Sequence, residues 1–332
     1  MTRFEDEFFG LQELPQPLAE ALLSGASALS THHLQRLISL VERLVSRCPA
    51  HHRQHFLPPL LKLFFSEIDK KISSEWEAIE KTTTQSAEED QLGDEMKAES
   101  ILRATTYSIV SFASSLLDQR PDADRPSTKV DPILTTRHLV LSDPSILEPL
   151  ILFCTHTLRM RDSRCCTIMT SLLRSLLPFF NGAAPPAPQV REFICTDVMK
   201  ACITSLNEPY FVDVQRDLAT LIANILRLYS DRTNAPREVL MSLPDMSAAK
   251  VERAIERVAN VSSERQQRAL VLDLLEGVRG VSIHEAGKID RRDVRAKRSA
   301  MQQGFMEVEK KVDVVRGGSP GLEGMADLFG GA

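Results

Sequence analysis

The chain has 332 residues, a formal net charge of −5 and a hydrophobic share of 43%, with aromatic residues at 5%. This length and hydrophobic share allow a large folded core. The acidic balance excludes a globally basic nucleic-acid binder but leaves room for a local basic surface, because binding depends on where the charges lie. No apolar run approaches the roughly 18 residues of a membrane span, and the first ten residues are acidic, unlike a targeting peptide. We therefore expect an intracellular protein without membrane insertion.

Six cysteines are spaced without a Cys-x-x-Cys pair, and three of them fall within apolar segments of helical period. A free cysteine in such a segment behaves as a small hydrophobic residue. The spacing therefore predicts reduced thiols rather than a disulfide framework or a zinc site. The six are Cys48, Cys154, Cys165, Cys166, Cys195 and Cys202.

Apolar residues recur at offsets of three and four along most of the chain, and no segment alternates as a strand would. The pattern predicts a short helix at 15–24 and a longer one at 33–48, which Pro49 ends. Nearly every such helix is followed by a second one, and repeated helix pairs are typical of an α-solenoid. We predict an all-α solenoid of HEAT-like antiparallel helix pairs. The apolar stripe of 33–48 consists of Leu34, Leu37, Ile38, Val41, Leu44, Val45 and Cys48.

Pro58 and Pro59 fit the first turn of a third helix, where a missing N–H costs little. The apolar stripe of this helix includes Trp76, the single tryptophan of the chain, which we expect to be a core residue. The segment 81–97 is polar and acidic. We interpret it as a disordered insertion or as a loop that merges into the next helix, at 97–118.

Residues 119–142 contain three prolines and no sustained period, which predicts a long connection. Asp143 is then a candidate N-cap, with Pro144 at the first helical position. Pro188 follows Asp143 by 45 residues, within the roughly 40–47 residues of a HEAT-type repeat. The predicted helices of this half are 143–160, 163–180, 189–206, 209–230, 236–242, 247–260 and 263–278.

The chain thus divides into N-terminal helical repeats at 1–118, a linker at 119–142, HEAT-like repeats at 143–280 and a flexible tail at 281–332. The tail is first basic and then glycine-rich, and its stretch 287–317 holds nine basic and five acidic residues. Some of these cations are candidate phosphate contacts for a nucleic acid, or part of a nuclear-localisation-like patch. The alternative is a solvated tail, since the interspersed acids soften the positive field. The candidate nucleic-acid-binding residues are Arg291, Arg292, Arg295, Lys297 and Arg298.

No P-loop, nucleophile elbow, zinc-protease motif or dinucleotide fingerprint occurs in a strand–turn–helix context, so the sequence predicts no catalytic residue, no cofactor and no enzyme. His51, His52 and His55 are close in sequence, but no nearby carboxylate or cysteine completes a metal-ligand set. We therefore expect a solvated helix start there and no metal. Cys165 and Cys166 would point about 100° apart on a helix, which favours core packing over a redox pair.

Three segments together resemble a known family. SSEWEAI at 73–79 follows the leucine-rich PPLLKLFF at 58–65, and PREVLMSLPD at 236–245 is a short helix that ends in Leu-Pro. The tail changes from a basic stretch to a glycine-rich one whose apolar anchor is Leu328 and Phe329. This order resembles the C-terminal region of the karyopherin-β superfamily, specifically the exportin-five branch of nuclear export receptors. The resemblance covers most of the chain but only the last part of a much longer receptor.

The resemblance implies a superhelix of HEAT repeats that binds cargo together with the GTP-bound form of Ran, passes nuclear pore proteins and shuttles between nucleus and cytoplasm. Structured RNA, such as a hairpin precursor or transfer RNA, and some proteins are the implied cargo. The principal Ran-binding repeats of the superfamily lie at the N-terminus, outside the region resembled here, so we expect a fragment, a truncated gene model or a partner that supplies them. The alternative is a general α-solenoid scaffold with protein partners and neither RNA nor Ran binding.

Overall fold

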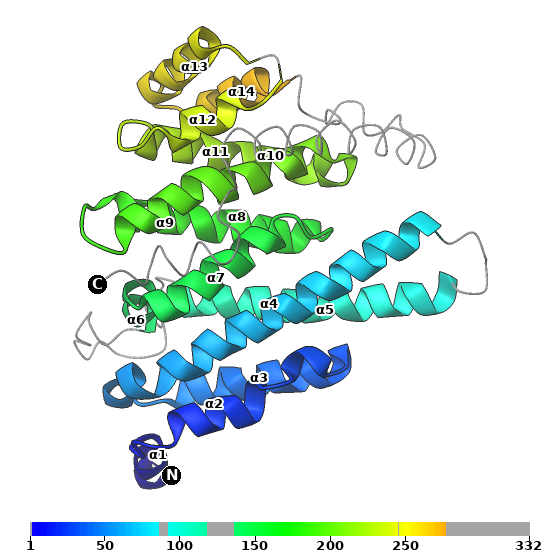
Figure 1. Ribbon diagram of the computed structural model, residues 1–332, viewed down its shortest axis with the longest axis vertical. Coiled ribbons are helices and arrows are strands. Elements are labelled where there is room, and N and C mark those ends of the chain that lie inside the picture. The colour runs from blue at the N-terminus through cyan, green and yellow to red at the C-terminus, as the bar shows by residue number, and fades with distance from the viewer. Residues whose placement is uncertain (1, 86–91, 118–135, 245, 277–332) are drawn as a thin grey trace. The chain divides into compact units, whose positions relative to one another are not determined.

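The computed structural model describes residues 2–85, 92–117, 136–244 and 246–276, and within these ranges the chain forms helices joined by turns, without a strand (Figure 1). The prediction of an all-α fold is confirmed. The chain divides into two compact units, 1–169 and 170–332, and the division falls within helix α8 (Ser163–Leu176). Each unit is described by itself below.

The first unit stacks its helices in two layers. Helix α2 packs on α4 and α4 on α7, whereas α3 packs on α5, so that neighbours within a layer are not consecutive in the chain (Figure 1). This is the arrangement that stacked helix pairs produce. The elements are α1 (Thr2–Phe9), α2 (Pro15–Leu23), η1 (Ala26–Ala28), α3 (Thr31–Arg47), η2 (Ala50–His52), α4 (Arg53–Gln85), α5 (Leu92–Leu117), α6 (Thr136–Ser142) and α7 (Pro144–Thr157).

A cluster of aromatic rings packs in the core of the first unit. The Phe112 ring of α5 lies 5.3 Å from the Phe64 ring and 6.4 Å from the Phe65 ring, both of α4. The Phe153 ring of α7 is 6.1 Å from Phe65, so three helices share one cluster. Further along α4, Trp76 is buried, which confirms its predicted place in the core.

Helix α4 begins earlier than the sequence predicts. We expected Pro58 and Pro59 in the first turn, but the helix starts at Arg53 and both prolines lie inside it, which corrects that prediction. The extra turn forms because Phe56 and Leu57 are buried there. Tertiary burial therefore outweighs the backbone hydrogen bonds that the prolines cannot make.

Helix α1 was absent from the predicted elements, although it is the first helix of the chain. It is attached to the start of α4 by aromatic contacts, since the Phe9 ring lies 4.7 Å and the Phe8 ring 6.0 Å from the Phe56 ring. Eight residues are too few for a stable isolated helix, so α1 depends on this packing.

Two predicted irregular segments contain helix at their edges. Helix α4 continues to Gln85 and α5 begins at Leu92, so both extend into the acidic segment 81–97, and 86–91 lie outside the described residues. The predicted linker 119–142 ends in helix α6, which buries Val140 and Leu141 against α7. Three adjacent apolar residues in seven are too short a stripe to establish a period, and the packing partner decides the conformation.

The N-cap of α7 forms as predicted. Asp143 Oδ1 accepts hydrogen bonds from the backbone N–H of Ser145 at 2.9 Å and from its hydroxyl at 2.7 Å, and Pro144 occupies the first helical position. The cap supplies an acceptor for one of the backbone N–H groups that have no partner within the helix at its start. Helix α7 and the beginning of α8 follow the predicted pair closely, and α8 ends at Leu176, two residues before Pro178.

The second unit contains shorter helices whose bounds lie close to the predicted ones. Helix α11 packs on α10, α13 and α14, and α13 packs on α12 and α14 (Figure 1). After the end of α8, the elements are η5 (Leu177–Asn181), α9 (Ala187–Phe193), the π-turn η6 (Ile194–Val198), α10 (Met199–Asn207), η7 (Pro209–Val214), α11 (Gln215–Tyr229), α12 (Ala235–Met241), α13 (Ala248–Asn260) and α14 (Glu264–Leu274).

One buried hydrogen bond links the layers of this unit. The Tyr229 hydroxyl at the end of α11 donates to the Leu177 carbonyl oxygen in η5 at 2.5 Å, and both residues are buried. Burial raises the pKa of Tyr229, so the hydroxyl keeps its proton and remains a donor.

Across the ranges given above, no single helix is both long and apolar enough to cross a membrane. Helices α6 and α7 reach the required length only when taken together, and they are bent by 90° where they join.

Candidate functional site

The five candidate residues of the tail, Arg291, Arg292, Arg295, Lys297 and Arg298, lie outside the described residues, as does the whole glycine-rich end. Their role as phosphate contacts therefore stays a prediction. The surface that the structure does describe offers three further features: a basic face on α3, a groove between α13 and α14, and a cluster of two histidines and an aspartate at the start of α4.

The basic face of α3 consists of Arg36, Leu40, Arg43 and Arg47, which recur at offsets of four, three and four. Residues at these offsets share one side of a helix. All four are exposed, whereas the opposite side buries the predicted apolar stripe against the core. The helix contains one acidic residue, Glu42, so the arginines give this face a positive field. The spacing of these arginines is visible in the sequence, although the predicted stripe of this helix describes only its apolar side.

The groove between α13 and α14 has a volume of about 710 Å³. It combines apolar side chains with charged ones of both signs and contains neither a histidine nor a thiol or hydroxyl nucleophile. The lining offers apolar, amide and charged contacts to a bound partner, and its carboxylates are those of Glu256 and Asp273. Its residues are Glu256, Arg257, Asn260, Val261, Gln266, Ala269, Leu270 and Asp273.

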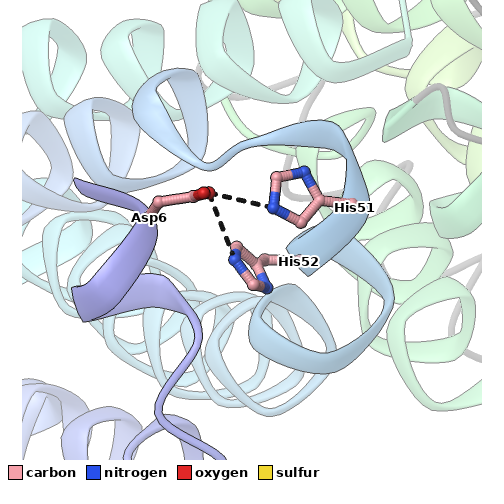
Figure 2. Close-up of side chains that lie close together, drawn as sticks. All are labelled: Asp6, His51 and His52. Carbon is pink, nitrogen blue, oxygen red and sulfur yellow. Dashed lines mark ion pairs between the residues drawn. The ribbon is translucent and has the colours of Figure 1, made fainter. Parts of the chain in front are cut away.

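The third feature corrects an expectation about His51 and His52. No carboxylate near them in sequence completes a ligand set, but α1 brings Asp6 to them in space (Figure 2). Asp6 Oδ1 lies 2.9 Å from His51 Nε2 and 3.4 Å from His52 Nε2. His55 lies apart from this cluster, with its Nε2 3.4 Å from the Leu11 carbonyl oxygen. Asp6 cannot be recognised as a partner of these histidines from the sequence, because α1 is not among the predicted helices.

All six cysteines lie within the described residues, where they are buried and form no disulfide. Burial raises the pKa of the Cys48 thiol and that of Cys154 to about 12 each, and it raises the pKa of Cys165 and Cys195 as well. Because the thiolate is the reactive form, these four thiols are poor nucleophiles at neutral pH. Cys165 and Cys166 both lie in the core, as predicted, and Cys166 Sγ contacts the Leu158 carbonyl oxygen at 3.9 Å.

Comparison with known proteins identifies the family. A family model described as Exportin-5 matches residues 1–290. The chain belongs to the exportin-5 family. This agrees with the resemblance found in the sequence, and the helical repeats described above are those expected for the family.

Related proteins cover most of this chain. An uncharacterized protein of Schizosaccharomyces pombe is 28% identical over 313 residues, which include 89% of this chain and 25% of the relative. Exportin-5 of Dictyostelium discoideum is 23% identical over 284 residues, or 85% of this chain and 23% of the relative. Protein HASTY 1 of Arabidopsis thaliana is 24% identical over 286 residues, or 78% of this chain and 23% of the relative. The chain thus spans about a quarter of the length of these relatives. No solved structure matches.

Proposed function

We propose that this chain is part of a Ran-GTP-dependent nuclear export receptor, which carries structured RNA or protein cargo and shuttles between nucleus and cytoplasm. The observation that carries the proposal is the match of the exportin-5 family model to residues 1–290. The helical repeats and the mixed apolar and charged lining of the α13–α14 groove support a binding protein.

The proposed mechanism is enclosure of cargo by stacked helices. Ran-GTP favours the cargo-bound state by binding it more tightly than the empty state, and nuclear pore proteins make the transient contacts of passage. We place the principal Ran site outside this chain, and cargo contacts within it. For an RNA cargo, we consider two sets of cations: the five candidates of the tail and the three exposed arginines of the α3 face, Arg36, Arg43 and Arg47.

Salt dependence of RNA binding tests this assignment. The full chain is titrated against a structured hairpin RNA by electrophoretic mobility at several salt concentrations. Five phosphate contacts from the tail would give a log–log slope of roughly −3.5 to −4.5, at about 0.7–0.9 per phosphate. Changing Arg291, Arg292, Arg295, Lys297 and Arg298 to Ala should remove most of that slope while the helical circular dichroism stays unchanged.

The matched variant changes Arg36, Arg43 and Arg47 of the α3 face to Ala. If the tail makes the contacts, this variant keeps the full slope. If only the α3 variant lowers the slope, by roughly 2 to 3, then the RNA lies on the repeats and the tail is solvated. If each variant lowers the slope by the amount expected for its own cations, both sets of residues contact the RNA.

Ran dependence is tested by adding Ran loaded with GTP or with GDP to the same titration. Coupling between two ligands of an allosteric protein is reciprocal and typically 5–150-fold. We expect the coupling to require the longer receptor and to be weak for this chain alone. If neither RNA nor Ran binds, either to this chain or to the chain extended by N-terminal repeats of a family member, the export proposal fails in favour of a protein-interaction scaffold.

A further inference from the structure

We propose that Asp6, His51 and His52 form a zinc-binding site that fastens helix α1 to the start of α4. Figure 2 shows the Asp6 carboxylate facing a ring nitrogen of both histidines. Each residue offers one ligand atom, and the three atoms lie within 4.8 Å of one another. The inference is independent of the proposed export function, because it concerns how the N-terminal helix is held.

The distances are close to those of a tetrahedral zinc site. Zn–N and Zn–O bonds of about 2.0–2.2 Å at tetrahedral angles separate two ligand atoms by about 3.3–3.5 Å. The distance from Asp6 Oδ1 to His52 Nε2, 3.4 Å, lies within this range, and the distance to His51 Nε2, 2.9 Å, is a few tenths of an ångström below it. Binding therefore needs side-chain adjustments of a few tenths of an ångström along these two edges.

The chemistry of the donors selects the metal. Imidazole nitrogens combined with a carboxylate oxygen suit zinc among the abundant divalent ions, whereas calcium and magnesium prefer oxygen donors alone. The side chains of His51, Asp6 and His52 are 61%, 54% and 20% exposed. A fourth position is therefore open to water, and the ion can enter without unfolding the site.

The surrounding fold holds the two sides of the site in register. The rings of Phe8 and Phe9 pack on Phe56, which follows His52 by four residues, and so attach α1 to the start of α4. Gly10 directly follows α1 and lies beside the His52 ring: a Cβ at this position would lie 3.3 Å from His52 Cε1 and 3.0 Å from the Asp6 carbonyl oxygen. A glycine thus leaves the His52 ring the space to face Asp6.

A carboxylate also pairs with imidazole in the absence of any metal, so the experiment separates an ion pair from a metal site. The full chain is stripped with a chelator and titrated with Zn²⁺ alone by calorimetry, and with Co²⁺ by visible absorption. We expect one equivalent of Zn²⁺, the intense absorption of tetrahedral Co²⁺, and a melting temperature that rises by roughly 5–10 °C at about 100 times the Kd.

Ligand variants identify the residues. Asp6→Asn should weaken zinc binding by at least about 10-fold, and His51→Gln with His52→Gln by more than about 100-fold, since even the supporting partners of metal ligands are worth roughly 10–100-fold. Both variants should lose the zinc-dependent rise in melting temperature. The matched control is His32→Gln with His33→Gln, a second adjacent histidine pair, whose rings lie 6.1 Å apart and which belongs to no such ligand set among the residues that the structure describes. This control should bind zinc as the unchanged chain does.

Three results would overturn the proposal: no binding of Zn²⁺ at micromolar concentration, binding that survives in the ligand variants, or binding that the control variant loses equally. Circular dichroism of each variant without metal shows that it is folded before titration. A ligand variant that is folded but still binds with the original affinity places the zinc elsewhere.

Discussion

Within the described residues, prolines lie inside helices in the first unit only, whereas both units place prolines at helix starts, as Pro15 of α2 and Pro144 of α7 do in the first. Pro58 and Pro59 lie inside α4, and Pro149 lies inside α7. In the second unit, four prolines occupy the first or second position of a helical element, where no N–H donor is needed. These four are Pro178, Pro188, Pro209 and Pro236.

The difference shows when local preference decides a helix and when packing does. An interior proline costs about 3 kcal/mol relative to alanine. Burying one aromatic ring of roughly 150–250 Å² returns roughly 4–6 kcal/mol at about 25 cal/mol per Å². Helix α4 buries Phe56 just before its prolines and Phe64 and Phe65 after them. The free energy gained by burying these rings therefore exceeds the free energy that the prolines cost the helix. In the second unit the prolines lie at helix starts, as their local preference predicts, and the bounds of these helices therefore follow from the sequence.

The largest expected effect is that of removing the Trp76 side chain. Trp76 is 7% exposed, its Nε1 donates to Thr106 Oγ1 at 3.1 Å, and the Arg103 guanidinium lies 5.3 Å from the ring centroid. We expect Trp76→Ala to lower the free energy of unfolding of the first unit by roughly 3–5 kcal/mol, the usual range for a buried large aromatic side chain. Chemical denaturation measures it. A loss under about 1 kcal/mol would contradict the importance of aromatic packing in this unit.

Replacing the interior prolines of α4 should have the next largest effect, in the stabilising direction. Pro58→Ala with Pro59→Ala restores two backbone N–H donors to the helix. Alanine also makes the unfolded chain more flexible, which offsets part of the gain. We expect a net increase of about 2–4 kcal/mol in the free energy of unfolding. The matched control is Pro236→Ala at the start of α12, which should lose at most about 1 kcal/mol. Equal effects at both places would remove the contrast between the units.

A smaller effect is expected in the second unit from Tyr229→Phe. The substitution keeps the buried ring but removes the hydroxyl that donates to the Leu177 carbonyl oxygen. We expect a loss of about 0.5–1.5 kcal/mol, the net value of one such hydrogen bond. Thermal unfolding followed by circular dichroism measures it. An unchanged melting temperature would mean that a water replaces the hydroxyl and that η5 is held by packing alone.

The smallest effect concerns Glu148 of α7. Burial raises the pKa of this carboxyl, and Lys62 opposes the shift. A raised folded-state pKa means that the folded state binds the proton more tightly than the unfolded state, so stability falls as the pH rises from the unfolded pKa of about 4.3 through the folded pKa. Glu148→Gln should therefore be slightly more stable than the unchanged chain at pH 7, by less than about 1 kcal/mol. The difference should vanish below pH 4, and a difference that grows on acidification would contradict the sign.

The candidate surfaces show how far sequence reasoning reaches. The exposed position of Arg36, Arg43 and Arg47 follows from their spacing once the apolar side of α3 is known. The basic face of α3 can therefore be predicted from the sequence. The pairing of Asp6 with His51 and His52 does not follow from any local pattern. It requires that α1 exists and docks on Phe56, which is a tertiary event.

The sequence by itself determined the helical class, the apolar stripes, the cap at Asp143 and the bounds of most helices of the second unit, because helix periodicity, capping and proline placement act within a few residues. Only the tertiary structure decided that α4 continues through Pro58 and Pro59, that α6 forms beside α7, and that Asp6 meets two histidines far along the chain. These outcomes depend on burial and on contacts between distant segments, whose free energies exceed the local preferences that a sequence displays.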